Sequence, residues 1–316
     1  MTPCRWRWRD PRNPISLPAM AKDNPTWVDQ ALELIRPVLP ARLRGDIPIV
    51  PVVRLSGVIG VVTPLRPGLT IAGVARMLDA AFKMRHARAV ALLINSPGGS
   101  PVQSHLIFRR VRELAKEHDL PVIAFIEDVG ASGGYMIACA ADEIVCDAAS
   151  MVGSIGVVGG SFGFHRLIEK IGIERRLYTS GERKAMLDPF LPEKPEDVKR
   201  LKAIQKEIHD SFIALVKERR GTKLQGPEKT LFSGEFWTGA RALELGIVDA
   251  IGEVRSSLRT RFGDKVLTPL IESARPSLIR RLVGAETGGD RWSRPGLGEE
   301  LVSALEARAL WARYGL

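Results

Sequence analysis

The chain has 316 residues, of which 45% are hydrophobic and 26% are charged, and this composition excludes a collagen-like or wholly disordered protein. Lysine and arginine outnumber aspartate and glutamate by 46 to 36, and the net charge of +10 permits attraction to nucleic acid or an anionic membrane without requiring either. The three cysteines form no Cys-x-x-Cys pair, which argues against a zinc site or a disulfide framework, and no stretch reaches the roughly 18 uncharged apolar residues of a membrane-spanning helix.

The first 46 residues divide into two parts. Residues 1–23 are rich in arginine, tryptophan and proline, and they predict either a disordered tail or a segment upstream of the true start, for which Met20 is an alternative initiator. Residues 24–46 predict a short amphipathic helix and a linker. The helix begins at Asn24-Pro25, an N-cap residue followed by proline, and its apolar residues recur at near-helical spacing over Trp27–Ile35.

Two interpretations of this amphipathic helix stay open. We expect it to pack on its own domain or on a sister subunit. The alternative is that it rests on a membrane, with Arg36, Arg42 and Arg44 facing lipid phosphates. Because no apolar signal-peptide core follows the N-terminal arginines, we expect a cytoplasmic protein, with peripheral contact to the inner membrane under the second interpretation.

From Ile47 onward the pattern alternates between strands and helices. We expect strands at Ile47–Leu55, Gly57–Val62, Ala89–Asn95, Pro121–Ile126, Ile144–Cys146 and Glu174–Thr179, and helices at Ile71–Arg85, Val102–Glu117, Tyr135–Ala141, Phe164–Ile171, Pro195–Arg219 and Ala240–Leu245. This alternation predicts an α/β domain with a largely parallel sheet over residues 47–263. Residues 264–316 are a C-terminal extension of unknown role, with a linker over 287–298 and an amphipathic helix over Glu299–Tyr314.

Two glycine-rich turns each follow an apolar strand and lead into a helix. The first is Asn95–Ser100 and the second is Gly130–Gly134. Free amides at a helix start favour negative charge, so such a turn can hold a phosphate or a developing oxyanion, although it can also be a simple tight turn. Neither turn has the order of a Walker or a dinucleotide motif, which argues against the phosphate interpretation.

The second turn matches Gly-x-Ser-x-Gly, the pattern of a nucleophile elbow, with Ser132 as the serine. A serine hydroxyl needs a base, because it is a weak nucleophile on its own. The base could be a histidine, His165 or His209, with Asp188 or Asp197 as its carboxylate partner.

The other candidate base is Lys184, which follows the strand expected at Glu174–Thr179 and precedes several apolar residues. A lysine base must be uncharged, while the pKa of free lysine is about 10.4. Burial among apolar side chains lowers that pKa by disfavouring the charged form.

These segments together resemble the signal peptide peptidase A family of serine peptidases. The matching motifs are Ile94–Ser100, Val129–Tyr135, Gly153–Val157, Ser180–Lys184 and Trp237–Gly239 with Ala242-Leu243 to Asp249. Their order and spacing agree with the family from about Ile47 to Phe262. The resemblance implies the crotonase-like superfold shared with the Clp protease subunit, an α/β fold with flanking helices.

By this resemblance Ser132 is the nucleophile and Lys184 the general base of a Ser–Lys dyad. Ser154 corresponds to the polar residue that orients the lysine, and backbone amides of Gly133 and of the Gly98-Gly99 turn would form the oxyanion hole. The family needs no metal or cofactor. In its short-form members the dyad is shared between subunits, which implies a homo-oligomer.

We therefore expect a serine endopeptidase that hydrolyses apolar peptides, such as residual signal peptides or membrane-protein fragments, through an acyl-enzyme. A Ser-His-Asp hydrolase, an acyl-CoA enzyme and a non-catalytic scaffold on the same fold are the alternatives. We expect no nucleic-acid partner, because the basic residues are spread along the chain without an aromatic-interleaved patch.

Overall fold

Apolar, β-branched segments form the strands of one sheet in the computed structural model, which describes residues 47–60, 68–181, 183–272, 305 and 308–316. The expected N-terminal tail, the amphipathic stretch Trp27–Ile35 and the linker over 287–298 lie outside the described residues. Among the helices that are described, none combines the length and the apolar character needed to cross a bilayer.

Strand β3 is the central strand of the sheet. The strand order is β6-β5-β3-β2-β1-β8, with β4 pairing both β3 and β7. The pairs are parallel except for β5 with β6. The strands are β1 Val52–Ser56, β2 Val90–Ser96, β3 Val122–Ala131, β4 Glu143–Cys146, β5 Met151–Gly153, β6 Phe236–Thr238, β7 Ala250–Ile251 and β8 Leu270–Ile271.

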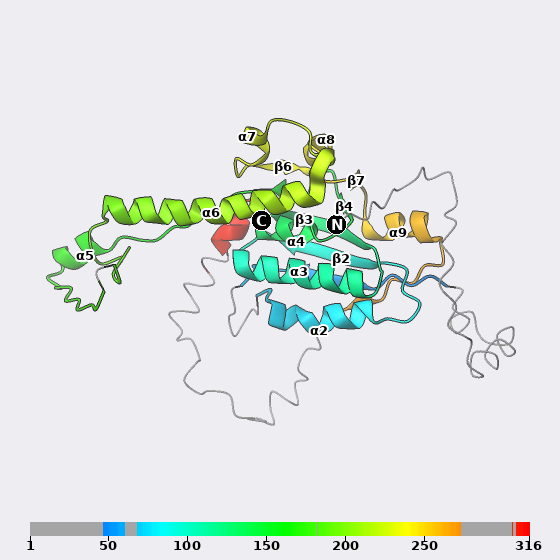
Figure 1. The fold of residues 1–316 in the computed structure, drawn as a ribbon, viewed down its shortest axis with the longest axis horizontal. Helices are drawn as coiled ribbons and strands as arrows, with labels where there is room; N and C mark the ends of the chain where they lie inside the picture. The colour runs from blue at the N-terminus through cyan, green and yellow to red at the C-terminus, as the bar shows by residue number, and fades with distance from the viewer. Residues whose placement is uncertain (1–46, 61–67, 182, 273–304, 306–307) are drawn as a thin grey trace, which may run out of the picture. The chain divides into compact units, whose positions relative to one another are not determined.

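Helices cover both faces of this sheet (Figure 1). The helices are α2 Ile71–Phe82, α3 Pro101–Glu117, α4 Gly133–Ala138, α5 His165–Lys170, α6 Pro195–Arg220, α7 Glu228–Leu231, α8 Gly239–Glu244 and α9 Val254–Phe262. Side-chain caps begin the two long helices beside the strands: the Thr70 hydroxyl accepts from Gly73 N–H, and the Ser100 hydroxyl accepts from Gln103 N–H.

The larger core lies on the face covered by α2, α3, α4 and the C-terminal part of α6, where Leu78, Ile107, Tyr135 and Val216 are buried. On the opposite face Leu258 of α9 packs against Phe125 and Val145. The strand β2 is buried along most of its length, as a strand of a parallel sheet covered on both faces must be.

The N-terminal end of helix α6 lies beyond the sheet, and Figure 1 shows α5 near that end. We call residues 156–208 the extension. Its side chains are mostly exposed, including large apolar ones. Helix α6 returns to the body where Phe212, Leu215 and Val216 become buried.

The α/β fold with a largely parallel sheet is confirmed. The strand expected at Glu174–Thr179 is wrong, because these residues are exposed and pair with no strand in the described part of the chain. Two segments beyond residue 263 contact this sheet: β8 joins it by pairing with β1, and Tyr314 packs against β3. The expected C-terminal helix is helical at Leu305 and over residues 308–312, the parts of it that are described.

Candidate active site

Ser132 lies at the point where β3 ends and α4 begins, with φ 51° and ψ −120°. A non-glycine residue in this region is strained, at a cost of roughly 1–3 kcal/mol, and such strain persists only where the surrounding structure enforces it. Here the Ser132 N–H donates to the carbonyl oxygen of Gly153, 2.8 Å away. The side chain is partly exposed, while Ala131 and Gly133 on either side are buried. This is the geometry of a nucleophile elbow.

The two glycine turns meet at Ser132. A methyl group on Gly98 would lie 2.8 Å from the Ser132 Cβ and 2.9 Å from the Gly133 nitrogen, so only glycine allows this approach. Gly98 also has φ +99°, a conformation that favours glycine. The amide of Gly133 lies in the first turn of α4, where backbone N–H groups have no partner within the helix.

Hydrogen bonds of the Ser96 hydroxyl fix the first glycine turn. The Ser96 hydroxyl donates to the carbonyl of Gly57 at 2.7 Å and accepts from the N–H of Gly98 at 3.2 Å. The Gly98 N–H is therefore already hydrogen-bonded within the turn. Gly99 N–H has no hydrogen-bond partner among the described residues, which leaves it as the amide of this turn available to a developing oxyanion.

Ser154 is brought to the same end of the sheet. It follows Gly153, the residue whose carbonyl holds Ser132, and its own N–H donates to the carbonyl of Glu235 at 2.6 Å. Ser154 is 6% exposed and has φ 53°. The Glu235 contact was missed by sequence reasoning, because a backbone carbonyl leaves no signal in residue type.

Lys184 lies elsewhere in the same chain. It is exposed in a turn of the extension, where its N–H donates to the Gly181 carbonyl at 3.2 Å. Figure 1 shows the region between α5 and α6 at the far end of α6, separate from α4. One chain thus brings together Ser132, Ser154, Gly98, Gly99 and Gly133, and it carries Lys184 away from them.

The described residues do not assemble the Ser-His-Asp triad that the histidine alternative requires. One ring nitrogen of His209 lies 3.0 Å from the carbonyl oxygen of Ile155. Asp197 precedes His209 by twelve residues on α6, which separates them by about 18 Å at about 1.5 Å per residue. Asp188 accepts instead from Arg175 at 2.9 Å and from Phe190 N–H, and these bonds lower its pKa. His165 lies on α5, at the far end of the extension.

The buried cysteines are poor nucleophiles. Burial raises the pKa of the Cys139 thiol to about 11 and that of the Cys146 thiol to about 12. Both thiols therefore stay protonated at neutral pH, and the reactive form of a cysteine is the thiolate.

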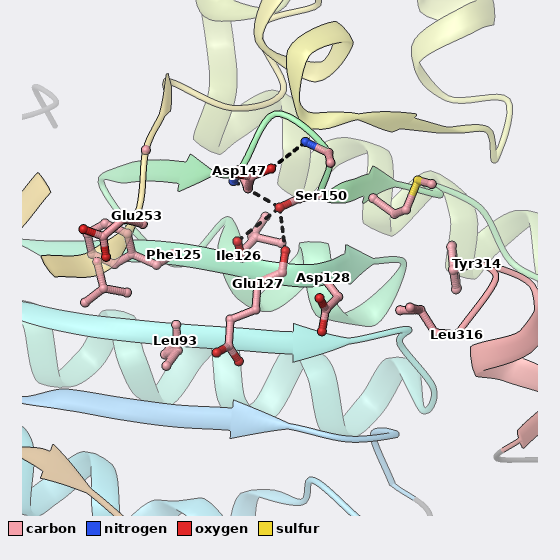
Figure 2. Close-up of a pocket in the computed structure, with 14 residues that line it drawn as sticks. Leu93, Phe125, Ile126, Glu127, Asp128, Asp147, Ser150, Glu253, Tyr314 and Leu316 are labelled. Atoms are coloured by element: carbon pink, nitrogen blue, oxygen red, sulfur yellow. Dashed lines mark hydrogen bonds between the residues drawn. The ribbon is translucent and has the colours of Figure 1, made fainter. Parts of the chain in front are cut away.

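A cavity of about 480 Å³ lies on the α9 face of the sheet, and Ser132, Ser154 and Lys184 do not line it (Figure 2). The four carboxylate side chains that line it each have a structural partner, and for Asp147 this is the N–H of Ala149 at 2.8 Å. Glu127 pairs with Arg54 at 2.9 Å, Asp128 accepts from Asn95 at 2.7 Å, and Glu253 caps the start of α9. Because these groups are already satisfied, the cavity does not compete with the Ser132 turn as the candidate active site.

The comparison with protein families covers the motifs from Val129 onward, whereas Ile94–Ser100 lies outside the matched residues. The model of peptidase family S49 matches residues 114–261. A protein of Synechocystis sp., named as a candidate protease, is 32% identical over 205 residues, which are 63% of this chain and 73% of that protein. The chloroplastic serine protease SPPA of Arabidopsis thaliana is 31% identical over 225 residues, 68% of this chain and 33% of that protein.

A longer protein shares still more identity. The Na⁺/H⁺ antiporter NhaA of Brucella abortus is 53% identical over 288 residues, which are 90% of this chain and 39% of the antiporter. This chain therefore spans well under two thirds of that relative. Among solved structures, a membrane-bound stomatin-specific protease aligns with 15% identity and a TM-score of 0.43, covering 73% of this chain and 98% of that one.

Proposed function

Because this chain belongs to peptidase family S49, we propose that it is a serine endopeptidase with Ser132 as its nucleophile and Lys184 of a neighbouring subunit as the general base. The observation that carries this proposal is the strained Ser132 elbow, beside which lie the Gly133 amide and the turn that contains Gly98 and Gly99. A serine held in this way presents its hydroxyl where a peptide carbonyl can approach two backbone donors.

In this mechanism Lys184 takes the proton from the Ser132 hydroxyl as the oxygen attacks the peptide carbonyl. The amides of Gly133 and Gly99 stabilise the resulting oxyanion. Lys184 then gives the proton to the leaving amine, and water hydrolyses the acyl-enzyme by the same route. Ser154, buried next to Gly153, would orient the lysine.

Sharing of the dyad between subunits is supported by the exposed side chains around Lys184. Several large apolar side chains of the extension are each more than half exposed: Val158, Phe162, Leu167, Ile171, Ile173 and Tyr178. Several large apolar side chains exposed on one segment are typical of a protein–protein contact. A second copy of the chain is the occupant we propose, because it would cover this surface and also bring its Lys184 to the Ser132 site, from which each chain carries its own Lys184 away.

The substrates we propose are apolar peptides, such as residual signal peptides or fragments of membrane proteins. Val102, which follows the first glycine turn at the start of α3, is 65% exposed. An exposed apolar side chain next to this turn favours apolar substrate residues. We do not carry over antiport from the Brucella protein, because this chain spans 39% of it.

Mixing two inactive variants tests the shared dyad. Ser132→Ala and Lys184→Ala, each purified alone, should fail to cleave a fluorogenic apolar peptide. When the two are dissociated and reassembled together, some interfaces regain both groups, and about a quarter of the sites should become active in a random closed ring. The measurement is the hydrolysis rate after reassembly, with the oligomeric state followed by sedimentation.

Two controls accompany this experiment. Ser211→Ala changes an exposed serine on α6 and should keep the wild-type rate. A doubly substituted Ser132→Ala/Lys184→Ala chain mixed with Ser132→Ala should stay inactive. Silence of the mixture, with each single variant folded and inactive, would exclude sharing between subunits. Hydrolysis by folded Ser132→Ala would exclude the serine peptidase mechanism itself.

A further inference from the structure

Residues 311–316 pack against β3, the strand that leads to Ser132. Tyr314 is 6% exposed and lies in a buried cluster with Val129 and Ala131 of β3. Trp311 and Met151 pack against the same cluster. Figure 2 shows Tyr314 and Leu316 at one end of the cavity on this face of the sheet.

The ring of Tyr314 also contacts β6. Its centroid lies 4.9 Å from that of Phe236 at an interplanar angle of 64°, an edge-to-face arrangement. Such aromatic pairs prefer this geometry and stabilise it beyond the area they bury. One side chain therefore touches two strands that are separated in the sheet by β5.

A defined helix end holds Tyr314 in place. Leu316 N–H donates to the Trp311 carbonyl at 3.4 Å, and Gly315 N–H donates to the Ala312 carbonyl at 3.2 Å. Gly315 has φ +78°, the left-handed conformation that this pair of bonds requires. Together these features form a Schellman motif, in which Tyr314 is the last residue before the glycine.

Both strands that Tyr314 contacts lie next to residues that position the proposed site. Ala131 directly precedes Ser132. Phe236 pairs with Gly153, whose carbonyl accepts the Ser132 N–H. Glu235, next to Phe236, holds the N–H of Ser154. Because the Ser132 backbone is strained, its geometry depends on contacts that prevent these strands from shifting.

We infer that the segment Trp311–Leu316 is a positioning element of the Ser132 site and that Tyr314 is the residue through which it acts. The inference rests on the proposed peptidase function, and it assigns a role to the end of the chain. Tyr314 acts through Ala131 and Phe236 to set the positions of Ser132 and Ser154. Its loss should therefore affect the chemical step more than the binding of a peptide.

Substitution of Tyr314 in the 316-residue chain tests this inference. Tyr314→Ala should lower kcat by about 10- to 100-fold with little change in KM, because a misplacement of about 1 Å can cost about 10²-fold. Tyr314→Phe keeps the ring against Phe236 and should restore most of the rate. Arg313→Ala, at an exposed neighbouring position, is the matched control and should keep the wild-type rate.

Tyr314→Leu guards against a variant that fails to fold, since leucine fills the space on β3 but loses the aromatic contact. It should show an intermediate kcat at a Tm close to that of the wild type. A folded Tyr314→Ala or Tyr314→Leu protein with the wild-type kcat would overturn the inference, and so would a rate loss equal to the loss of folded protein. Absence of Ser132-dependent hydrolysis in the wild type would instead overturn the proposed function.

Discussion

The surroundings of Ser132 and those of Lys184 are built in opposite ways. Ser132 lies between buried residues, its N–H is bonded within the sheet, and two glycine turns meet beside it. Lys184 lies in an exposed turn, and the residues over 174–181 that precede it are exposed as well. The first region is complete within one chain, whereas the second has an apolar surface that remains uncovered. Under the proposed function, this difference means that the nucleophile is preorganised by its own chain while the base is supplied by association.

The largest effect on the rate of hydrolysis should come from substitution of the exposed Lys184. Lys184→Arg should reduce hydrolysis by about 10³-fold or more, because guanidinium stays protonated and cannot accept the Ser132 proton. Arg183→Lys, the reverse exchange at the neighbouring exposed position, should leave the rate unchanged. Steady-state rates on an apolar peptide, measured at equal oligomer concentration, check both. A Lys184→Arg protein of near-normal rate would return His209 and His165 to consideration as the base.

The buried side of the comparison should respond in stability. Arg220 is 4% exposed, and it donates to Asp249 at 2.6 Å and to the carbonyl of Gly246 at 2.7 Å. Arg220→Met leaves the Asp249 carboxylate without this partner and should lower the free energy of unfolding by about 3–5 kcal/mol. Denaturant unfolding measures the loss.

Lys223→Met is the matched control, because Lys223 pairs with the same carboxylate from a side chain that is 48% exposed. Its loss should cost about 1 kcal/mol or less. Equal losses from the two substitutions would show that the burial of the Arg220 pair adds nothing to its strength.

A smaller effect is expected from pH. Burial raises the pKa of Asp249, but hydrogen bonds from Arg220, Lys223 and Ile144 N–H outweigh it and hold the pKa below the usual value of 3.8. The folded state therefore binds a proton less readily than the unfolded state, and the resulting stability is present above about pH 4 and lost as the pH falls through the folded pKa. Asp249→Asn should be less stable at pH 7 and flatter below pH 4.

Asp188 provides the counterpart in the extension, since Arg175 lowers its pKa as well. Asp188→Asn should change the pH dependence of global unfolding much less than Asp249→Asn, because its contacts lie in an exposed segment. Chemical unfolding curves recorded from pH 7 to pH 3 compare the two. A larger change from Asp188→Asn would mean that the extension unfolds together with the body.

Much of the body could be predicted from periodicity. Val90–Ser96 and Pro101–Glu117 agree with the expected strand and helix to within a residue or so, because apolar runs and helical spacing are local signals. The three-residue strands β5 and β6 could not be predicted, since they are strands only through pairing with each other and with β3. Glu174–Thr179 has strand-like residues, but a strand needs a partner, and the described chain supplies none.

The candidate site divides in the same way. Ser132 and the glycine turns could be recognised because their chemistry is written in a few adjacent residues. The hydrogen bond from the Gly98 N–H to the Ser96 hydroxyl could not be predicted, because it depends on the backbone conformation of the first turn. No sequence signal distinguishes Tyr314 from other tyrosines, since its role depends on the positions of Ala131 and Phe236.

The antiparallel pair of β5 and β6 bears on the order in which the protein folds. Strand β3 lies far from Phe236, Glu235 and Tyr314 in the sequence, although these residues contact its end or the strand beside it. The contacts that hold Ser132 and Ser154 are therefore long-range contacts, and closing the chain between them carries an entropy cost. The parallel pairing of β2 with β3 needs a shorter closure, so a folding chain would build its central strands first and order its nucleophile later.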